Sequence, residues 1–254
     1  MTWKIRSRFT CLLILVCAGS LAQAEEKWVA DEIFLQISEL RKTVQELKIQ
    51  MGRMNQELAD LKREVENSKP TMPLVGTETR IQGKAEAPLV IAEFSDYQCP
   101  YCRKHATATL PRLRQDYVDT GKVRYLLRDF PLGFHGEARK AAIAARCAGE
   151  QGQYWPMHDR LFERQDHLSK DTYAALAKEL GLKPADFAAC LDDPRQARAV
   201  DEDSALGERL GVQGTPAFFV GRVRNGQLTD LKKLAGTQPY EAFQRVIEEY
   251  SKPR

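Results

Sequence analysis

The chain has 254 residues, 43% of them hydrophobic, and its 38 Lys and Arg residues nearly balance its 35 Asp and Glu residues. This composition is typical of a globular protein with one sizeable core, and it excludes a wholly disordered chain, which would be poorer in apolar residues. The formal net charge of +3 is too small to favour binding to nucleic acid or to an anionic membrane surface. We therefore expect no nucleic-acid partner.

The N-terminal segment has the organisation of a secretory signal peptide. Three basic residues precede the apolar segment 11–18, which leads to the small-residue sequence Ala22-Gln23-Ala24. Charge, apolar stretch and small residues in this order are typical of a cleaved signal. We predict a signal peptide over residues 1–24 and export to the periplasm. An uncleaved membrane anchor is the alternative, although the apolar stretch is short for a bilayer span.

Export would change both the charge balance and the cysteine count. Removal of residues 1–24 takes away three of the 38 basic residues and leaves 35 to balance the 35 acidic ones. It also leaves four cysteines, at positions 99, 102, 147 and 190. An even number of cysteines in an oxidising compartment allows two disulfide pairs.

Residues 25–66 carry apolar side chains at alternating spacings of three and four, which is the heptad pattern of a coiled coil. Position a holds Ile37, Val44, Met51, Leu58 and Val65, and position d holds Leu40, Leu47, Met54 and Leu61. Nearly every residue off this narrow seam is polar, whereas a helix packed on its own domain, the alternative, usually has a wider apolar face. We predict a homo-oligomer, a dimer or a trimer, through residues 30–66.

The polar, proline-containing segment 67–75 predicts a linker between this helix and a globular part. The globular part is predicted in three stretches: an α/β region over 76–135, a helical region over 136–210 and a second α/β region over 211–254. In chain order we expect a strand at 89–94, a helix from 99 to about 120, a strand at 123–127, the helical region, strands at 217–220 and 228–234, and a helix at 240–250.

The sequence Cys99-Pro100-Tyr101-Cys102 lies where the strand at 89–94 gives way to a helix. Such a position favours the thiolate of the first cysteine, because unpaired backbone amides and the helix dipole meet at the helix N-terminus. Pro100 suits the first helical position, where its missing N–H group costs nothing. We predict that Cys99 attacks a substrate sulfur and that Cys102 resolves the mixed disulfide.

Three segments together make the chain resemble thioredoxin-fold proteins of the DsbA type, in which a helical domain is inserted in the fold. They are 83–88 leading into the strand at 89–94, 94–102 with its two cysteines, and 211–216 ending in Gly-Thr-Pro. The resemblance covers about residues 74–250. It implies an α/β thioredoxin-like fold with an inserted helical domain, here preceded by a long coiled-coil helix.

The resemblance also assigns roles to individual residues. The family proline that matches Pro216 is cis and lies against the dithiol, and the residue before it, here Thr215, offers backbone groups to a substrate peptide. With Pro100 and Tyr101, these residues are predicted to bind substrate. Glu93 matches a buried acid that the family places beneath the dithiol. Such a carboxylate would have a raised pKa and could exchange a proton with Cys102, and a solvated residue at a strand end is the alternative.

Other uses of the four cysteines remain open from the sequence. A zinc site could recruit His105, which lies three residues after Cys102, and copper(I) could bind the two thiolates. A structural disulfide between Cys99 and Cys102 is a further alternative. We favour the redox dithiol, with no metal and no cofactor. Cys147 and Cys190 are predicted to form a structural disulfide, and two buried free thiols are the alternative.

These features predict an exported protein thiol:disulfide oxidoreductase that forms or rearranges disulfides. We expect its partners to be exported proteins with thiols or disulfides and a membrane redox partner. An oligomeric isomerase or reductase and a copper(I)-handling dithiol protein are the alternatives. The strongest oxidants of the family carry His where this chain has Tyr101, so the resemblance implies a less oxidising protein.

Overall fold

The computed structural model describes residues 3–74 and 76–252, and it describes side chains only for 27–65, 69–74 and 76–252. The chain forms two compact units, residues 1–68 and 69–254. Residues 1 and 2 of the expected signal peptide lie outside the described residues, as do the side chains of its remaining residues. Its cleavage and the predicted export therefore stay predictions.

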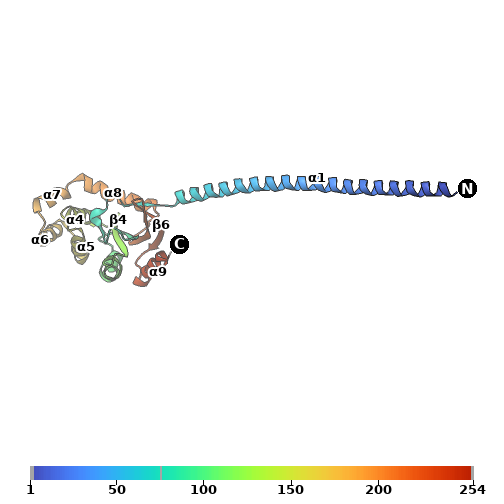
Figure 1. The fold of residues 1–254 in the computed structure, drawn as a ribbon. Coiled ribbons are helices and arrows are strands. Elements are labelled where there is room, and N and C mark those ends of the chain that lie inside the picture. Colours follow the sequence, from blue (N-terminus) through green and yellow to red (C-terminus); the bar gives the residue numbers. More distant parts are fainter. Residues whose placement is uncertain (1–2, 75, 253–254) are drawn as a thin grey trace. The chain divides into compact units, whose positions relative to one another are not determined.

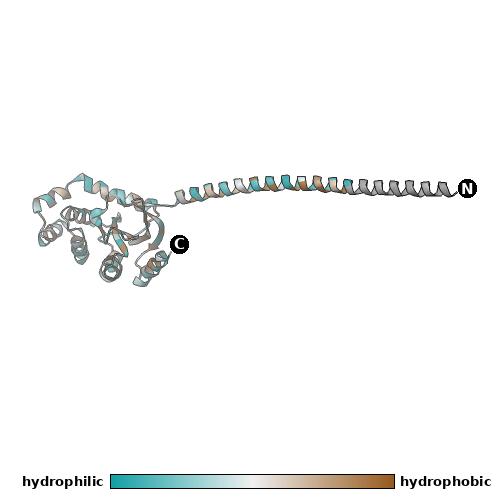
Figure 2. Cartoon of the chain, in the orientation of Figure 1, coloured by the Kyte–Doolittle hydropathy of each residue, from teal (hydrophilic) through white to brown (hydrophobic). Residues whose placement is uncertain are grey.

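The first unit is a single helix, α1 (Trp3–Ser68). The apolar residues at the a and d positions are exposed, from 43% at Val44 to 65% at Leu40. Figure 2 shows apolar and polar residues interleaved along the coloured part of this helix. Among the residues that the structure describes, no helix is both long and apolar enough to cross a bilayer. The seam therefore has the exposure that the coiled-coil prediction requires.

The second unit contains a six-stranded mixed sheet in the order β1-β6-β5-β3-β4-β2 (Figure 1). Its strands are β1 (Met72–Pro73), β2 (Ile81–Gln82), β3 (Leu89–Ser95), β4 (Val123–Asp129), β5 (Ala217–Arg224) and β6 (Gln227–Ala235). Strands β3 and β4 are parallel, whereas β5 runs antiparallel to both β3 and β6. The four longer strands match the strands that the sequence predicted.

Strand β3 lies in the interior of the sheet and is buried along its whole length. Leu89 and Ile91 pack on one face, against α9 (Tyr240–Ser251) and the helical segment after the dithiol. Val90 and Ala92 pack on the other face, in the core that includes Leu206. Successive side chains of a strand point to opposite faces. A strand that is covered on both faces therefore has consecutive apolar residues in its sequence.

The crossover between β3 and β4 is one helical stretch with two widened turns. It consists of α2 (Pro100–Lys104), the π-helical turn η2 (His105–Thr109), α3 (Leu110–Leu113) and the π-helical turn η3 (Arg114–Val118). Pro111 in α3 cannot donate a backbone hydrogen bond, and its ring would crowd the carbonyl group four residues earlier. We attribute the widened turn just before it to this proline.

The helical insertion lies between β4 and β5. It comprises α4 (Ala138–Glu150), α5 (Tyr154–Glu163), η4 (Gln165–His167), α6 (Lys170–Glu179), α7 (Pro184–Leu191) and α8 (Pro194–Arg209). Helices α4 to α7 gather on one side of the unit (Figure 1). A disulfide joins Cys147 of α4 to Cys190 of α7. The structural disulfide that the sequence predicted is therefore present, and not the two free thiols that were its alternative.

The helical insertion is not a separately packed unit, because its last helix also covers the sheet. A side chain at Gly207 of α8 would come within 2.7 Å of Phe130 and 3.0 Å of Phe94, so glycine permits this close approach. The boundaries expected at 136 and 211 therefore do not separate compact units, and residues 69–254 pack as one.

The linker expected over 67–75 is shorter than the sequence suggested. Met72 is fully buried, and Met72–Pro73 forms edge strand β1, which pairs with Leu228 and Gln227 of β6. A two-residue edge strand leaves no alternating pattern in the sequence, and Pro73 tolerates an edge position because it needs no ladder partner for a backbone N–H. A short helical turn, η1 (Glu78–Arg80), follows.

A buried charge cluster ties this N-terminal segment to the rest of the unit. Asp203 of α8 accepts hydrogen bonds from Arg80 after β1, Arg128 of β4 and Arg146 of α4. Arg146 also pairs with Asp129, 2.5 Å from Nε to Oδ2. Because each of these charges is removed from water, the cluster is stable only while its members remain paired.

Candidate active site

The two cysteines sit at the start of α2, as the sequence predicted for a strand-to-helix junction. Cys99 is the N-cap residue, and Pro100 is the first residue of the helix. The backbone amide of Cys99 donates to the Asp96 carbonyl oxygen (3.1 Å), and its own carbonyl accepts from the Arg103 amide (3.1 Å). Both cysteines are free thiols and both are buried, Cys102 completely.

The environment of Cys99 stabilises its thiolate. The pKa of this thiol is lowered to about 5, chiefly by the hydrogen bond with the Cys102 thiol. Burial opposes this shift, while Thr215 and the backbone amides of Tyr101 and Cys102 support it. A thiol with this pKa is almost fully ionised at neutral pH, so Cys99 is a nucleophile as it stands.

Cys102 behaves in the opposite way. Burial raises the pKa of its thiol well above the ordinary value, and the hydrogen bond with Cys99 and the charge of Glu93 raise it further. The proton of the pair is therefore held by the inner sulfur while the outer sulfur is ionised. This division matches the roles that the sequence predicted, with Cys99 attacking and Cys102 resolving, but Cys102 must lose its proton before it can act.

Glu93 lies on β3 in the core beneath the dithiol. Only 1% of this residue is exposed, and burial raises the pKa of its carboxyl group to about 7. The Tyr125 hydroxyl donates to Oε2 (2.5 Å) and the Ser95 hydroxyl donates to Oε1 (2.8 Å), and both bonds favour the ionised form. The structure thus places Glu93 in the buried environment, and not in the solvated one that was its alternative.

Ser95 connects this carboxylate to the inner cysteine. Its hydroxyl donates to Glu93 Oε1, and it also lies near enough to Cys102 to lower the pKa of that thiol. A hydroxyl group between a thiol and a carboxylate can pass a proton from one to the other, since it both donates and accepts. The arrangement therefore offers a route by which Cys102 loses its proton to Glu93.

Thr215 and Pro216 lie against the dithiol, joined by a cis peptide bond. Cys99 Sγ lies 3.3 Å from the Thr215 carbonyl oxygen, to which it can donate only in its protonated form. A groove of about 540 Å³ adjoins this contact. Its lining includes Tyr101, Lys104, Thr215, Pro216, Lys233 and Thr237. Tyr101 is 63% exposed, so three of the four residues predicted to bind substrate line an open groove beside the nucleophile. Pro100, also exposed, is not part of that lining.

Several polar residues that sequence reasoning missed hold the loop before Cys99. The buried Asp96 carboxylate accepts from the Leu132 amide (2.7 Å) and pairs with His135 Nδ1 (2.8 Å). From η4 in the helical insertion, Gln165 donates to the carbonyl oxygens of Tyr97 (2.7 Å) and Cys99 (3.0 Å). These contacts fix the backbone around the reactive sulfur. No local pattern marks these four contacts, because their partners are at least 36 residues apart in the chain.

Tyr125 and His105 are the other functional candidates that the sequence left unassigned. His105 was considered only as a zinc ligand beside the cysteines, but its Nε2 atom lies 2.9 Å from the Tyr125 hydroxyl in a fully buried position. Within the part of the chain that the structure describes, no three His, Cys, Asp or Glu side chains gather to hold a metal ion. In this arrangement His105 bonds to Tyr125 through Nε2, and its role as a zinc ligand stays an untested alternative.

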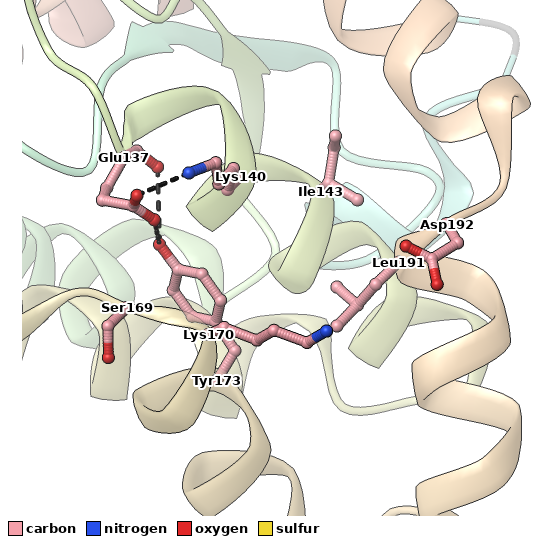
Figure 3. A pocket seen from close by; sticks show the side chains of 8 residues that line it. All are labelled: Glu137, Lys140, Ile143, Ser169, Lys170, Tyr173, Leu191 and Asp192. Atoms are coloured by element: carbon pink, nitrogen blue, oxygen red, sulfur yellow. Dashed lines mark hydrogen bonds and ion pairs between the residues drawn. The ribbon is translucent and has the colours of Figure 1, made fainter.

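A second cavity, of about 420 Å³, lies among α4, α6 and the end of α7 (Figure 3). Glu137 anchors its rim, accepting from the Tyr173 hydroxyl (3.0 Å) and pairing with Lys140 (2.7 Å). The predicted site residues do not line it. The backbone amide of Glu137 donates to the Gln98 side chain (2.5 Å), so one hydrogen bond joins this rim to the residue that precedes Cys99.

Comparison with known proteins agrees with this geometry. A family model described as thioredoxin matches residues 76–249. A Na⁺/H⁺ antiporter, NhaA 3 of Salinispora tropica, is 37% identical over 61% of this chain and 24% of its own length. The probable disulfide bond formation protein D of Bacillus anthracis is 32% identical over 59% of this chain and 74% of its own. The crystal structure of oxidised BdbD from Bacillus subtilis is 27% identical, with a TM-score of 0.58 over 71% of this chain and 97% of that one.

These matches differ in how much of each protein they cover. The chain spans about a quarter of the length of the antiporters it matches, but about three quarters of the disulfide bond formation protein from Bacillus anthracis. The family model covers most of the second compact unit, including its β3-to-α2 dithiol. The thioredoxin-like fold predicted from the sequence is confirmed.

Proposed function

The chain belongs to the thioredoxin family, and on that premise we propose that it is a DsbA-like protein thiol:disulfide oxidoreductase that acts on exported proteins in the periplasm. The observation that carries the proposal is the pairing of an ionised outer sulfur with a protonated inner one. Cys99, with its pKa lowered to about 5, lies 3.3 Å from the Thr215 carbonyl oxygen at the edge of an open groove, while Cys102 is buried behind it.

The proposed exchange balances as follows. The Cys99 thiolate attacks a substrate disulfide, one substrate sulfur leaves with the electron pair, and a mixed disulfide forms. Cys102 then passes its proton through Ser95 to Glu93 and attacks Cys99, which releases the second substrate thiolate and leaves the Cys99–Cys102 disulfide. The substrate is reduced and the dithiol is oxidised by two electrons. Run in reverse, the same steps transfer a disulfide to a reduced substrate.

The low pKa of Cys99 favours the reverse direction, in which this protein oxidises its substrates. Stabilising the thiolate stabilises the reduced dithiol, which makes the disulfide form a better oxidant. A pKa of about 5 lies between the value of about 3.5 for the strong oxidant DsbA and about 7 for thioredoxin. We therefore propose a moderately oxidising protein that donates disulfides and is reoxidised by a membrane redox partner.

The test compares oxidation of reduced ribonuclease with refolding of scrambled ribonuclease. A disulfide donor accelerates the first assay in its oxidised form, whereas an isomerase accelerates the second in its reduced form. Cys99→Ala should abolish both activities, and Cys102→Ala should trap mixed disulfides through Cys99. The Cys147→Ala/Cys190→Ala protein is the matched control and should retain activity. Failure of the Cys102→Ala protein to trap substrate would contradict the proposal, and copper(I) bound at the dithiol without exchange would favour the metal-handling alternative.

We also propose that residues 37–65 of α1 form a parallel coiled coil between copies of this chain. The exposed a and d residues supply the apolar seam. Arg41, Lys48 and Lys62 all occupy position e, whereas Glu57 and Glu64 occupy position g. A parallel pair sets Glu57 of one copy against Lys62 of the next, while an antiparallel pair sets basic e positions against each other. Charge therefore favours the parallel arrangement.

The oligomer is tested in the full mature chain by sedimentation equilibrium. We expect a dimer or a trimer, and we expect the Leu47→Glu/Leu61→Glu protein to be a monomer. Ile49→Glu is the matched control, because Ile49 is 49% exposed but lies off the seam. With the dithiol changed to serine, a Leu40→Cys variant should form a disulfide between copies only if the helices are parallel and in register. A monomeric parent chain, or no such crosslink, would contradict the proposal.

A further inference from the structure

A chain of buried hydrogen bonds extends from Glu93 away from the dithiol. The Tyr125 hydroxyl lies 2.5 Å from Glu93 Oε2, and His105 Nε2 lies 2.9 Å from the same hydroxyl. His105 and Tyr125 are fully buried, and Glu93 is 1% exposed. Substrate contacts and the proposed sulfur exchange do not involve His105. His105 is therefore a buried polar group to which the proposed exchange gives no role.

The number of hydrogen atoms available on each group fixes which group donates in these hydrogen bonds. A tyrosine hydroxyl carries one hydrogen, and here that hydrogen goes to the Glu93 carboxylate. The Tyr125 oxygen can then only accept, so the imidazole must be the donor. We assign His105 the tautomer with hydrogen on Nε2. The other ring nitrogen, Nδ1, is buried and has no hydrogen-bond partner among the described residues. That is the nitrogen that should be bare in this tautomer, since a buried N–H without a partner would be the costlier choice.

The surroundings keep this imidazole neutral. Burial, together with the smaller effect of the nearby His158, lowers the pKa of His105 to about 3. Its ring packs 4.5 Å from that of Phe218 and 5.5 Å from that of Phe243, centroid to centroid. An apolar cage of this kind holds the ring in place and prevents its protonation. The donor is therefore a fixed neutral N–H group at every pH at which the dithiol works.

We propose that His105 is a positioning residue, which holds the Tyr125 hydroxyl in the orientation that donates to Glu93. Through that orientation it keeps the Glu93 carboxylate ionised near neutral pH, ready to take the proton that Cys102 must lose. The inference rests on the proposed function, because it concerns the resolving step of the exchange. That step forms the Cys99–Cys102 bond, breaks the bond between Cys99 and the substrate sulfur, and leaves the electron pair on the substrate.

Other polar and charged groups lie around Glu93, but they do not replace the hydrogen bond from Tyr125. Arg114 of η3 favours the ionised carboxylate from a distance, and the Cys99 thiolate disfavours it. Ser95 donates from the same strand, and Cys102 faces the site from α2. Of these groups, Ser95 alone donates a hydrogen bond directly to the carboxylate, and its hydroxyl is also engaged with Cys102. The second donor, Tyr125, is the one whose orientation another residue controls.

The test follows the resolving step as a function of pH. A mixed disulfide between Cys99 and a chromophoric thiol is prepared on the full mature chain, and release of that thiol is timed in a single turnover. The parent rate should rise with a midpoint near pH 7, the pKa of Glu93. In His105→Phe the midpoint should move upward by about one pH unit, the effect expected for one lost hydrogen bond. The plateau at high pH should be unchanged.

Three further variants separate positioning from packing. His105→Gln can still donate from its amide and should restore most of the parent profile. His158→Phe is the matched control, because His158 is equally buried but bonds to Asp159, and it should leave the midpoint unchanged. In a Glu93→Gln background, His105→Phe should no longer shift the profile. An unshifted midpoint in His105→Phe, or an equal shift in His158→Phe, would overturn the inference.

The two proposals fail in distinguishable ways. If the parent chain does not release the thiol at any pH, the exchange function itself is wrong. If it releases the thiol with an unchanged profile in the His105 variants, only the positioning role is wrong. The His105→Gln variant and the intact plateau at high pH guard against misfolding as an explanation, because an unfolded site would lose activity at every pH.

Discussion

Cys99 Sγ lies 3.3 Å from the carbonyl oxygen of Thr215, although 116 residues separate the two in the chain. Sheet topology produces this contact. Strand β3 ends just before Cys99, strand β5 begins just after Pro216, and the two strands are antiparallel neighbours with Phe94 opposite Ala217. The end of one strand therefore lies beside the start of the other. The helical insertion lies between these strands in the sequence and contributes Gln165 to the site.

Alkylation of Cys99 should report its lowered pKa. We expect iodoacetamide to modify Cys99 in the reduced protein with a rate that rises around pH 5, while Cys102 stays unmodified. Cys102→Ala should move this midpoint upward by more than one unit, because the hydrogen bond with Cys102 is the largest cause of the shift. Rates measured by mass spectrometry between pH 4 and pH 9 check this. A midpoint near 9 in the parent chain would show that the thiolate is not stabilised.

Glu93→Gln should stabilise the protein at high pH. The carboxyl group has an ordinary pKa of 4.5 when unfolded and about 7 when folded. Between these values the folded state holds a proton that the unfolded state releases, so stability falls as pH rises. The cost reaches about 3 kcal/mol above pH 7, and it is absent below pH 4.5.

Urea unfolding of the oxidised protein at pH 4 and pH 8 measures this difference. The variant should match the parent at pH 4 and exceed it at pH 8. Glu86→Gln, a change at an exposed glutamate, is the control and should show no such difference. Equal stabilities of parent and Glu93→Gln at pH 8 would mean that burial does not penalise the carboxylate.

Removing the disulfide between α4 and α7 should destabilise the second unit without disabling the dithiol. The bridge joins residues 43 positions apart, and a loop of that size predicts a loss of about 4 kcal/mol in the chain-entropy account. Thermal unfolding of Cys147→Ala/Cys190→Ala checks the magnitude. Exchange at Cys99 should persist below the new melting temperature, because neither cysteine of the bridge contacts the reactive pair through a hydrogen bond.

Asp203→Asn should be among the most destabilising conservative changes in the chain. Burial alone would raise the pKa of Asp203, but Arg80, Arg128 and Arg146 overcome it and hold the carboxylate ionised. Removing that charge leaves the buried guanidinium groups of Arg80 and Arg128 without a carboxylate partner, which costs about 3 to 5 kcal/mol. The control is Asp201→Asn on the same helix, whose pair with Arg139 is exposed and is worth less than about 1 kcal/mol. Similar losses in the two variants, measured by urea unfolding, would contradict the prediction.

The sequence predicted the elements that leave periodic or compositional marks. The fully apolar run at 89–94 indicated a strand buried on both faces, and the heptad seam of α1 indicated a long helix. The two-residue strand β1 and the short strand β2 were not predicted. Such short edge strands form because a neighbouring strand is present, and for Met72 that neighbour is Leu228, more than 150 residues away in the chain. The close packing of α8 on the sheet likewise depends on Gly207, and a single glycine in a helix does not identify its partner.

The sequence by itself determined that a dithiol follows a buried strand and opens a helix, because spacing and local residue types are enough to specify that junction. Only the tertiary structure decided how the dithiol is tuned. Thr215 reaches Cys99 through strand order, and Tyr125, which His105 contacts, reaches Glu93 through packing. A pKa depends on burial and on neighbours in space, so the sequence indicated a stabilised thiolate at Cys99 but did not identify the neighbours that set its pKa. The order of the strands and the filling of the core convert two ordinary thiols into an ionised nucleophile and its protonated partner.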